Sequence, residues 1–161
     1  MLIGVISDTH DRLPMIDRAL DLFVRRGVAA VIHPGDIVAP FAAKRLLAWK
    51  GPLHLTYGNN DGERAGLKKL LPQIQEGPLW VDLAGKRILV HHFIDWCRPE
   101  DVATADIVIT GHTHEVTTHY EGRKLLLNPG ECCGWVTGRC TVALLDTDGP
   151  AAEICELDEA R

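Results

Sequence analysis

The chain has 161 residues and a formal net charge of −5; 46% of its residues are hydrophobic and 24% are charged. This length and composition suit one folded domain, residues 1–161, with a sizeable core, and they exclude a disordered chain. The moderate negative charge offers no footprint for sequence-independent binding to nucleic acid or to a membrane surface.

Targeting signals and disulfide patterns are not evident in the sequence. No charge-free stretch approaches the roughly 18 apolar residues that a membrane-spanning helix needs. The apolar start of the chain runs directly into Asp8, without the basic region or cleavage site of a secretory signal. The five cysteines are odd in number and form no C-x-x-C pair, which argues for a reducing compartment. We therefore expect a cytoplasmic protein.

Strand and helix signals alternate along the first part of the chain. Short apolar runs predict buried strands, and runs with apolar residues at helical spacing follow them. Such alternation is typical of parallel β-α-β units, whose crossovers bring successive strand ends to one edge of a sheet. The predicted elements are a strand over 2–7, a helix from Pro14 to the stop at Gly27, a strand over 28–33, a helix over 40–50 and a strand over 53–57.

The second part of the chain reads as mostly antiparallel β structure. The runs 79–83 and 87–91 flank Ala84, Gly85 and Lys86, which predicts a hairpin. A short helix over 99–104 and a strand over 107–110 follow, and further strands are expected over 116–120, 124–127, 140–145 and 151–157. The whole pattern predicts an α/β fold in which two packed, mixed sheets are flanked by helices.

Ligand-type side chains follow five of the predicted strands. Side chains at positions i and i+2 of an extended backbone point to the same side, so each of the two closely spaced pairs could chelate an ion. Seven ligands are too many for one small ion but suit two ions that share a carboxylate, and Asp36 is the natural bridge. Histidine, carboxylate and amide ligands without thiolate favour manganese, iron, nickel or zinc. The residues are Asp8 and His10, Asp36, Asn59, His91, and His112 and His114.

Other candidate residues have simpler interpretations. His33, His54 and His119 are interpreted as structural, although His33 lies near Asp36 in the sequence and could orient it. Cys132 and Cys133 are interpreted as core or loop residues, because adjacent cysteines do not easily close around one tetrahedral ion. Glycines at 35, 58 and 111 stand directly before proposed ligands, which indicates tight turns that aim the next side chain.

The order of these motifs resembles the calcineurin-like metallophosphoesterases, specifically the small single-domain bacterial and archaeal phosphodiesterases. The resemblance covers nearly the whole chain and implies a four-layer α/β/β/α sandwich. It also implies that one ion is held by Asp8, His10, Asp36 and His114, and the other by Asp36, Asn59, His91 and His112. The motifs are Asp8-Thr9-His10, Gly35-Asp36, Gly58-Asn59-Asn60-Asp61, His91, Gly111-His112-Thr113-His114 and the loop 128–133.

The activity implied is that of a metal-dependent phosphodiesterase acting on small phosphate esters. A hydroxide bridging two divalent ions, manganese first with iron, nickel or zinc as alternatives, would attack phosphorus. Asp36, Asn60 and Asp61 are the candidate catalytic residues. Many relatives carry histidine where this chain has Asn60, and an amide cannot deliver a proton as imidazolium does. We therefore expect weaker activity on esters with poor leaving groups.

Several alternatives stay open at this point. The chain reads His91-His92-Phe93 where family members commonly read His-Gly-His, so a shift of one residue would make His92 the ligand. Trp96 and Trp135 fall in loops near proposed ligands and could line a pocket. The same site could serve a phosphomonoesterase, and the same fold is used as a protein-binding scaffold in a retromer subunit. A polymeric nucleic-acid substrate is disfavoured by the net charge, and a homo-oligomer is possible.

Overall fold

Three apolar runs near the N-terminus form parallel strands in the computed structural model, which describes residues 1–157. They are β1 (Leu2–Val5), β2 (Ala30–His33) and β3 (Leu53–Leu55), connected by α1 (Leu13–Arg25) and α2 (Pro40–Leu46). Antiparallel strands β9 (Thr141–Asp146) and β10 (Ala151–Glu156) complete this sheet in the order β10-β9-β1-β2-β3. Because β1, β2 and β3 are parallel, the loops that follow them share one edge of the sheet.

The second sheet is mixed, as the sequence predicted. Its strands are β4 (Leu79–Leu83), β5 (Lys86–Val90), β6 (Ile107–Ile109), β7 (Val116–Glu121) and β8 (Lys124–Pro129), in the order β4-β5-β6-β8-β7. Strands β5, β6 and β8 are parallel, while β4 and β7 pair antiparallel at the two edges. The segment between β5 and β6 is long enough to act as a crossover, which permits the parallel pairing.

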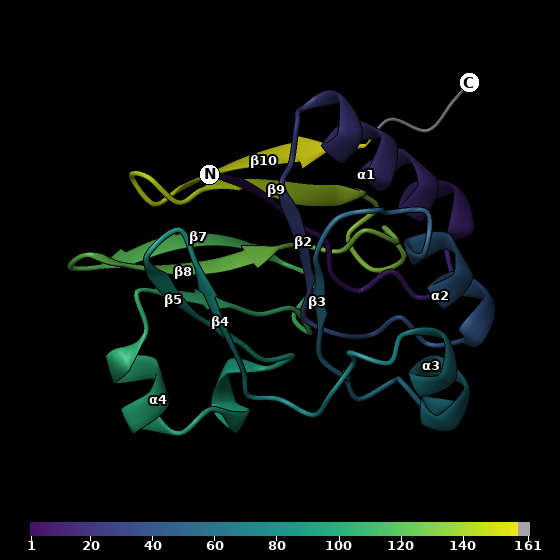
Figure 1. The fold of residues 1–161 in the computed structure, drawn as a ribbon, viewed down its shortest axis with the longest axis horizontal. Coiled ribbons are helices and arrows are strands. Elements are labelled where there is room, and N and C mark those ends of the chain that lie inside the picture. The colour runs from purple at the N-terminus through teal and green to yellow at the C-terminus, as the bar shows by residue number, and fades with distance from the viewer. Residues whose placement is uncertain (158–161) are drawn as a thin grey trace.

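Helices cover the outer face of each sheet, and the two inner faces pack together (Figure 1). Helices α1, α2 and α3 (Arg64–Leu70) lie on the first sheet. A short 3₁₀ helix, η1 (Ile94–Trp96), and α4 (Pro99–Thr104) lie on the second. This is the four-layer α/β/β/α arrangement that the sequence predicted.

Alternation along β1 shows how the layers are specified. Ile3 and Val5 are fully buried between the two sheets. The position between them, Gly4, faces α1, where a Cβ atom would lie 2.8 Å from the ring of Phe23. The absence of a side chain at Gly4 therefore lets α1 pack closely on the sheet.

The remaining differences from the predicted elements are local. Helix α3 was not predicted, because Leu67 is its one buried residue and Gly66 lowers its helix propensity. Helix α2 ends at Leu46 rather than at Lys50. None of the helices in residues 1–157 is long and apolar enough to cross a membrane.

Candidate metal centre

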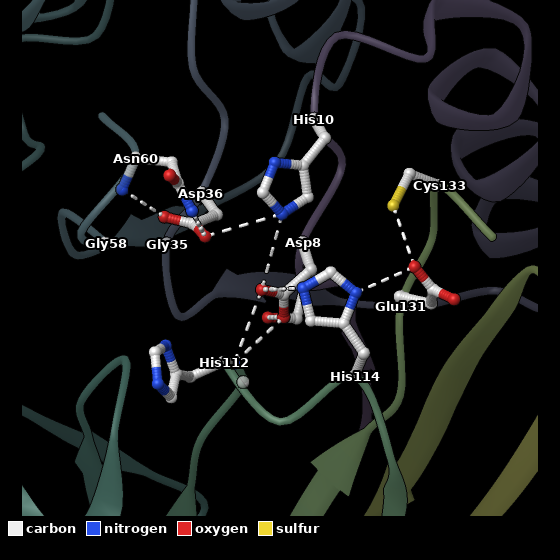
Figure 2. Close-up of polar contacts among 12 residues, drawn as sticks. Asp8, His10, Gly35, Asp36, Gly58, Asn60, His112, His114, Glu131 and Cys133 are labelled. Atoms are coloured by element: carbon white, nitrogen blue, oxygen red, sulfur yellow. Dashed lines mark hydrogen bonds and ion pairs between the residues drawn. The ribbon is translucent and has the colours of Figure 1, made fainter. Parts of the chain in front are cut away.

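The loops after β1, β2, β3, β5 and β6 meet at one edge of the sandwich, where the side chains of Asp8, His10, Asp36 and His114 point toward one another (Figure 2). One group of donors surrounds Asp8. The Nε2 atom of His10 lies 3.4 Å from Oδ2 of Asp36 and 3.8 Å from Oδ1 of Asp8. The Nε2 atom of His114 lies 3.5 Å from the same Asp8 oxygen. Asp8, His10, Asp36 and His114 therefore form a first donor group.

A second donor group lies on the other side of Asp36. The side-chain oxygen of Asn59 lies 2.9 Å from Nε2 of His92 and 2.8 Å from Nδ1 of His112. The same His92 nitrogen lies 3.4 Å from Oδ2 of Asp36. Asp36 thus belongs to both donor groups.

The histidine of the second group is His92 rather than His91, the first of the two alternatives that the sequence had left open. The ring of His91 lies 5.6 Å from that of Trp96 and packs against Gly77, and no hydrogen bond or ion pair joins it to the cluster within residues 1–157. Strand β5 ends at Val90, so the backbone has left the regular strand at these two residues. The Nδ1 atom of His92 lies 3.0 Å from the carbonyl oxygen of Pro34, which turns Nε2 toward Asn59.

Left-handed backbone conformations, rather than extended ones, bring the side chains together. The φ angles of Asp8, His10, Asp36, His112 and His114 are 49°, 36°, 61°, 68° and 63°. Such angles are unfavourable for residues with a Cβ atom and are found mainly where function requires them. The prediction that residues i and i+2 would chelate from an extended backbone was therefore wrong in its mechanism. His112 and His114 instead lie in different donor groups.

Two glycines allow the loops to approach each other closely. A Cβ atom at Gly58 would lie 2.2 Å from Oδ1 of Asp36, and one at Gly111 would lie 2.0 Å from Oγ of Ser7. Neither glycine has a positive φ. They are needed for close packing of the loops against Asp36 and Asp8, and not for the tight turns that the sequence indicated.

Asp61, a candidate catalytic residue in the sequence, directs its carboxylate to backbone N–H groups in this structure. Its buried carboxylate accepts hydrogen bonds from the backbone N–H groups of Asp36, Val38 and Gly58, at 3.0, 2.7 and 2.7 Å. It therefore ties the loop after β2 to the loop after β3. Asn60, in contrast, does reach the cluster, because its side-chain amide donates to Oδ2 of Asp36 at 2.7 Å.

The carboxylates and the histidines of the cluster shift one another's pKa values toward the charged forms. Burial alone would raise the pKa of Asp36, but hydrogen bonds from His92 and Asn60 and the charge of His92 outweigh it and hold this pKa well below its usual value. Burial would likewise lower the pKa values of His10 and His92. Nearby carboxylates outweigh this effect and raise both pKa values. They are Asp8 and Asp36 for His10, and chiefly Asp36 for His92.

The residues fit divalent metal ions. Donor atoms that share one ion through bonds of roughly 2.0–2.2 Å lie about 3–3.5 Å apart, close to the separations around His10 and His114. Donor atoms of Asp8, His10 and Asp36 all lie within 4.8 Å of one another. The Nε2 atom of His10 is buried and lacks a hydrogen-bond partner within residues 1–157. Imidazole, carboxylate and amide donors suit a transition-metal ion.

Two residues next to the cluster were not recognised from the sequence. The fully buried carboxylate of Glu131 lies 2.7 Å from Nδ1 of His114, and the Cys133 thiol lies 3.0 Å from the same Glu131 oxygen. Burial would raise the pKa of Glu131, but hydrogen bonds from Cys133, Thr137 and His114 outweigh it and hold this pKa at about 2. The signal in the sequence for Glu131 and Cys133 was their place in the 128–133 loop. The neighbouring Cys132 is a core residue.

The rim of the cluster carries two exposed tryptophans. The ring of Trp96, 48% exposed, lies 6.0 Å from that of His112. Trp135, 63% exposed, donates its indole N–H to the carbonyl oxygen of His10 at 3.3 Å. A cavity of about 540 Å³ opens beside Arg12 and Trp135. His33 does not orient the Asp36 carboxylate; its ring contacts the Thr9 hydroxyl and the Gly35 N–H.

Comparison with known proteins agrees with this geometry. The family model of the calcineurin-like phosphoesterase superfamily domain matches residues 1–149. The chain is 40% identical over 156 residues to the phosphodiesterase MJ0936 of Methanocaldococcus jannaschii, covering 92% of this chain and 94% of that protein. A solved archaeal phosphodiesterase superposes with a TM-score of 0.85 at 34% identity, covering 98% of this chain and 100% of that one.

The fold and the comparisons define a phosphoesterase. The chain belongs to the calcineurin-like phosphoesterase superfamily, and the prediction of a metal-dependent hydrolase of phosphate esters is confirmed at that level. Vps29 of Entamoeba histolytica also superposes, with a TM-score of 0.67 at 20% identity over 98% of this chain and 100% of that one. That likeness shows the fold alone, so the scaffold alternative is not favoured.

Proposed function

We propose that this protein hydrolyses small phosphate diesters with two divalent ions, manganese foremost, bound at the two donor groups. Asp8, His10, Asp36 and His114 would hold one ion, and Asp36, Asn59, His92 and His112 the other. The observation that carries the proposal is the shared position of Asp36, whose Oδ2 atom lies 3.4 Å from Nε2 of both His10 and His92. A carboxylate between two imidazoles is the arrangement that a two-metal site needs.

The chain's own residues would prepare this reaction. Bound ions supply Lewis acidity toward the phosphate and activate water for in-line attack on phosphorus. The carboxylates of Asp8 and Asp36 would balance the positive charge of the ions. The Pro34 carbonyl fixes the orientation of His92, and Asp61 fixes the backbone on both sides of Asp36. These contacts keep the donors in place before substrate arrives, which lowers the cost of reorganisation during the reaction.

The preference for diesters rests on Asn60 and on the relative named as a phosphodiesterase. The Asn60 amide lies on Asp36, at the position from which it could donate a hydrogen bond to a bound phosphate oxygen. An amide has no proton to give to a leaving group at neutral pH. Esters whose leaving groups need no protonation are therefore the expected substrates.

The surroundings of the site are consistent with a small substrate. Trp96 and Trp135 stand at the rim and would contact the organic part of an ester. We further propose that the chain acts as a single domain in the cytoplasm, and a homo-oligomer is compatible with this proposal.

The test is hydrolysis of bis-p-nitrophenyl phosphate by chelator-stripped protein as Mn²⁺ is added back. Activity should appear with metal, and Asp36→Asn should lower it by at least about 100-fold, because loss of an outer-shell partner alone costs 10- to 100-fold. Asp82→Asn, at an exposed position of strand β4, is the matched control and should leave activity unchanged.

Two results would contradict the proposal. One is a stripped protein that hydrolyses the diester as fast without metal as with it. The other is faster turnover of p-nitrophenyl phosphate than of the diester, which would favour the phosphomonoesterase alternative.

A further inference from the structure

Glu131 occupies an unusual position for a carboxylate. It is fully buried behind His114, on the side away from Asp8 (Figure 2). It lies in the loop between β8 and β9, which is anchored to the metal-binding edge through backbone hydrogen bonds from Cys132 and Cys133 to the carbonyl oxygens of Ser7 and Asp8. The carboxylate therefore belongs to a rigid part of the molecule that contacts the first donor group.

Hydrogen-bonding groups converge on both oxygens of Glu131. One oxygen, Oε1, accepts from the backbone N–H groups of Val136 and Thr137 and from the Thr137 hydroxyl at 2.7 Å. The other, Oε2, faces Nδ1 of His114 at 2.7 Å and the Cys133 thiol at 3.0 Å. Because Oε1 and Oε2 both face hydrogen-bond donors, the arrangement fits a His114 ring that carries its proton on Nδ1.

The consequence concerns the opposite nitrogen of the same ring. A neutral imidazole with its proton on Nδ1 has a free lone pair on Nε2, and in His114 that atom lies 3.5 Å from Oδ1 of Asp8. The ring of His92 is oriented in a comparable way, because its Nδ1 faces the Pro34 carbonyl oxygen and its Nε2 faces Asn59. In both donor groups, a fixed acceptor lies behind a histidine whose other nitrogen faces the cluster.

We infer that Glu131 is a positioning residue that sets the tautomer and the orientation of His114 for metal binding. The inference rests on the proposed function only in that the ligand is a divalent metal ion. Partners of this kind behind a ligating histidine raise its basicity and typically contribute 10- to 100-fold in metal affinity.

The same geometry assigns a role to Cys133. Its sulfur and the ring nitrogens of His10 and His114 lie within 4.8 Å of one another, so its position alone would allow it to be a ligand. In this structure its thiol donates a hydrogen bond to Oε2 of Glu131 at 3.0 Å. Cys133 therefore supports Glu131 from the side opposite Thr137.

The test compares Glu131→Gln with the wild type. The amide oxygen of glutamine can keep the contacts to Val136 and Thr137, while its NH₂ group would donate to Nδ1 of His114. The proton should then move to Nε2, the nitrogen that faces the cluster. Ring ¹⁵N chemical shifts of His114, measured in metal-free protein at pH 8, report the tautomer directly, and calorimetry reports Mn²⁺ affinity.

We expect His114 to carry its proton on Nδ1 in the wild type and on Nε2 in Glu131→Gln, with Mn²⁺ affinity at least about 10-fold lower in the variant. Glu121→Gln, on exposed strand β7, is the matched control and should change neither quantity. A variant that keeps both the wild-type tautomer and the wild-type affinity would overturn the inference.

The wild-type spectrum alone also decides the question if Glu131→Gln fails to fold, because a proton on Nε2 of wild-type His114 contradicts the assignment. Failure of the proposed function is a separate outcome. It would be seen as absent diester hydrolysis in a protein whose His114 tautomer and metal affinity are as expected here.

Discussion

The side-chain oxygen of Asn59 lies 2.9 Å from Nε2 of His92, and this contact selects one of two adjacent histidines for the metal centre. We expect His92→Ala to lower Mn²⁺-dependent diester hydrolysis by at least about 100-fold, because it removes a donor next to Asp36. His91→Ala should keep activity within a few-fold, since the His91 ring packs against Trp96. Steady-state kinetics of the two variants gives the comparison, and the reverse order of effects would restore His91 as the ligand.

Gly58 tests how tightly the loops must approach Asp36. In Gly58→Ala the new Cβ atom would lie 2.2 Å from Oδ1 of Asp36, so the loops must move apart. We expect a loss of about 1–3 kcal/mol in the free energy of unfolding together with weaker Mn²⁺ binding. Gly62→Ala is the matched control, because a Cβ atom there meets nothing within 4 Å. Equal urea midpoints for the two variants would contradict the close approach.

Asp61 separates a positioning role from a catalytic one. Asp61→Asn replaces one of two acceptor oxygens by a donor where three backbone N–H groups converge. The metal-free variant should lose about 1–3 kcal/mol of unfolding free energy, measured by urea denaturation against Asp82→Asn. A variant with full stability and a large fall in kcat would instead make Asp61 a catalytic residue.

The buried imidazole of His33 gives the protein a defined acid sensitivity. Burial lowers the pKa of His33 to about 4 from the 6.5 of an exposed histidine. Between these values the unfolded chain binds a proton that the folded chain does not, so stability falls as pH falls from 6.5 to 4. The full loss from this group is roughly 3 kcal/mol.

The measurement is the free energy of unfolding of metal-free protein at pH 7.5 and pH 4.5. His33→Gln should reduce the difference between the two values, whereas His119→Gln, at an exposed position, should not. An unchanged difference in His33→Gln would show that other groups set the acid sensitivity.

The layers of the fold and most members of the cluster were predictable from the sequence. Apolar runs at alternating strand and helix spacing predicted the parallel strands, and parallel strands bring Asp8, Asp36 and Asn59 to one edge. The parallel pairing of β5 with β6 was harder to predict. The crossover between these strands holds only a 3₁₀ turn and a short helix, so its sequence resembles an ordinary loop. Helix α3 has a single buried residue and therefore almost no apolar pattern.

What the sequence could not give is the backbone conformation of the loops. The choice between His91 and His92 depends on where β5 ends and on the carbonyl of Pro34, which is distant in the chain. Glu131 reaches His114 only because the loop after β8 docks on the Asp8 backbone. Five of the proposed ligands have left-handed backbone φ angles, and such isolated conformations produce no periodic pattern of residue types in the sequence.

The most direct test of a shared Asp36 is an anomalous difference map from crystals grown with Mn²⁺. The account predicts two peaks, one among Asp8, His10 and His114 and one among Asn59, His92 and His112, with the Asp36 carboxylate between them. A single peak that does not contact Asp36, or no peak at saturating Mn²⁺, would contradict the account.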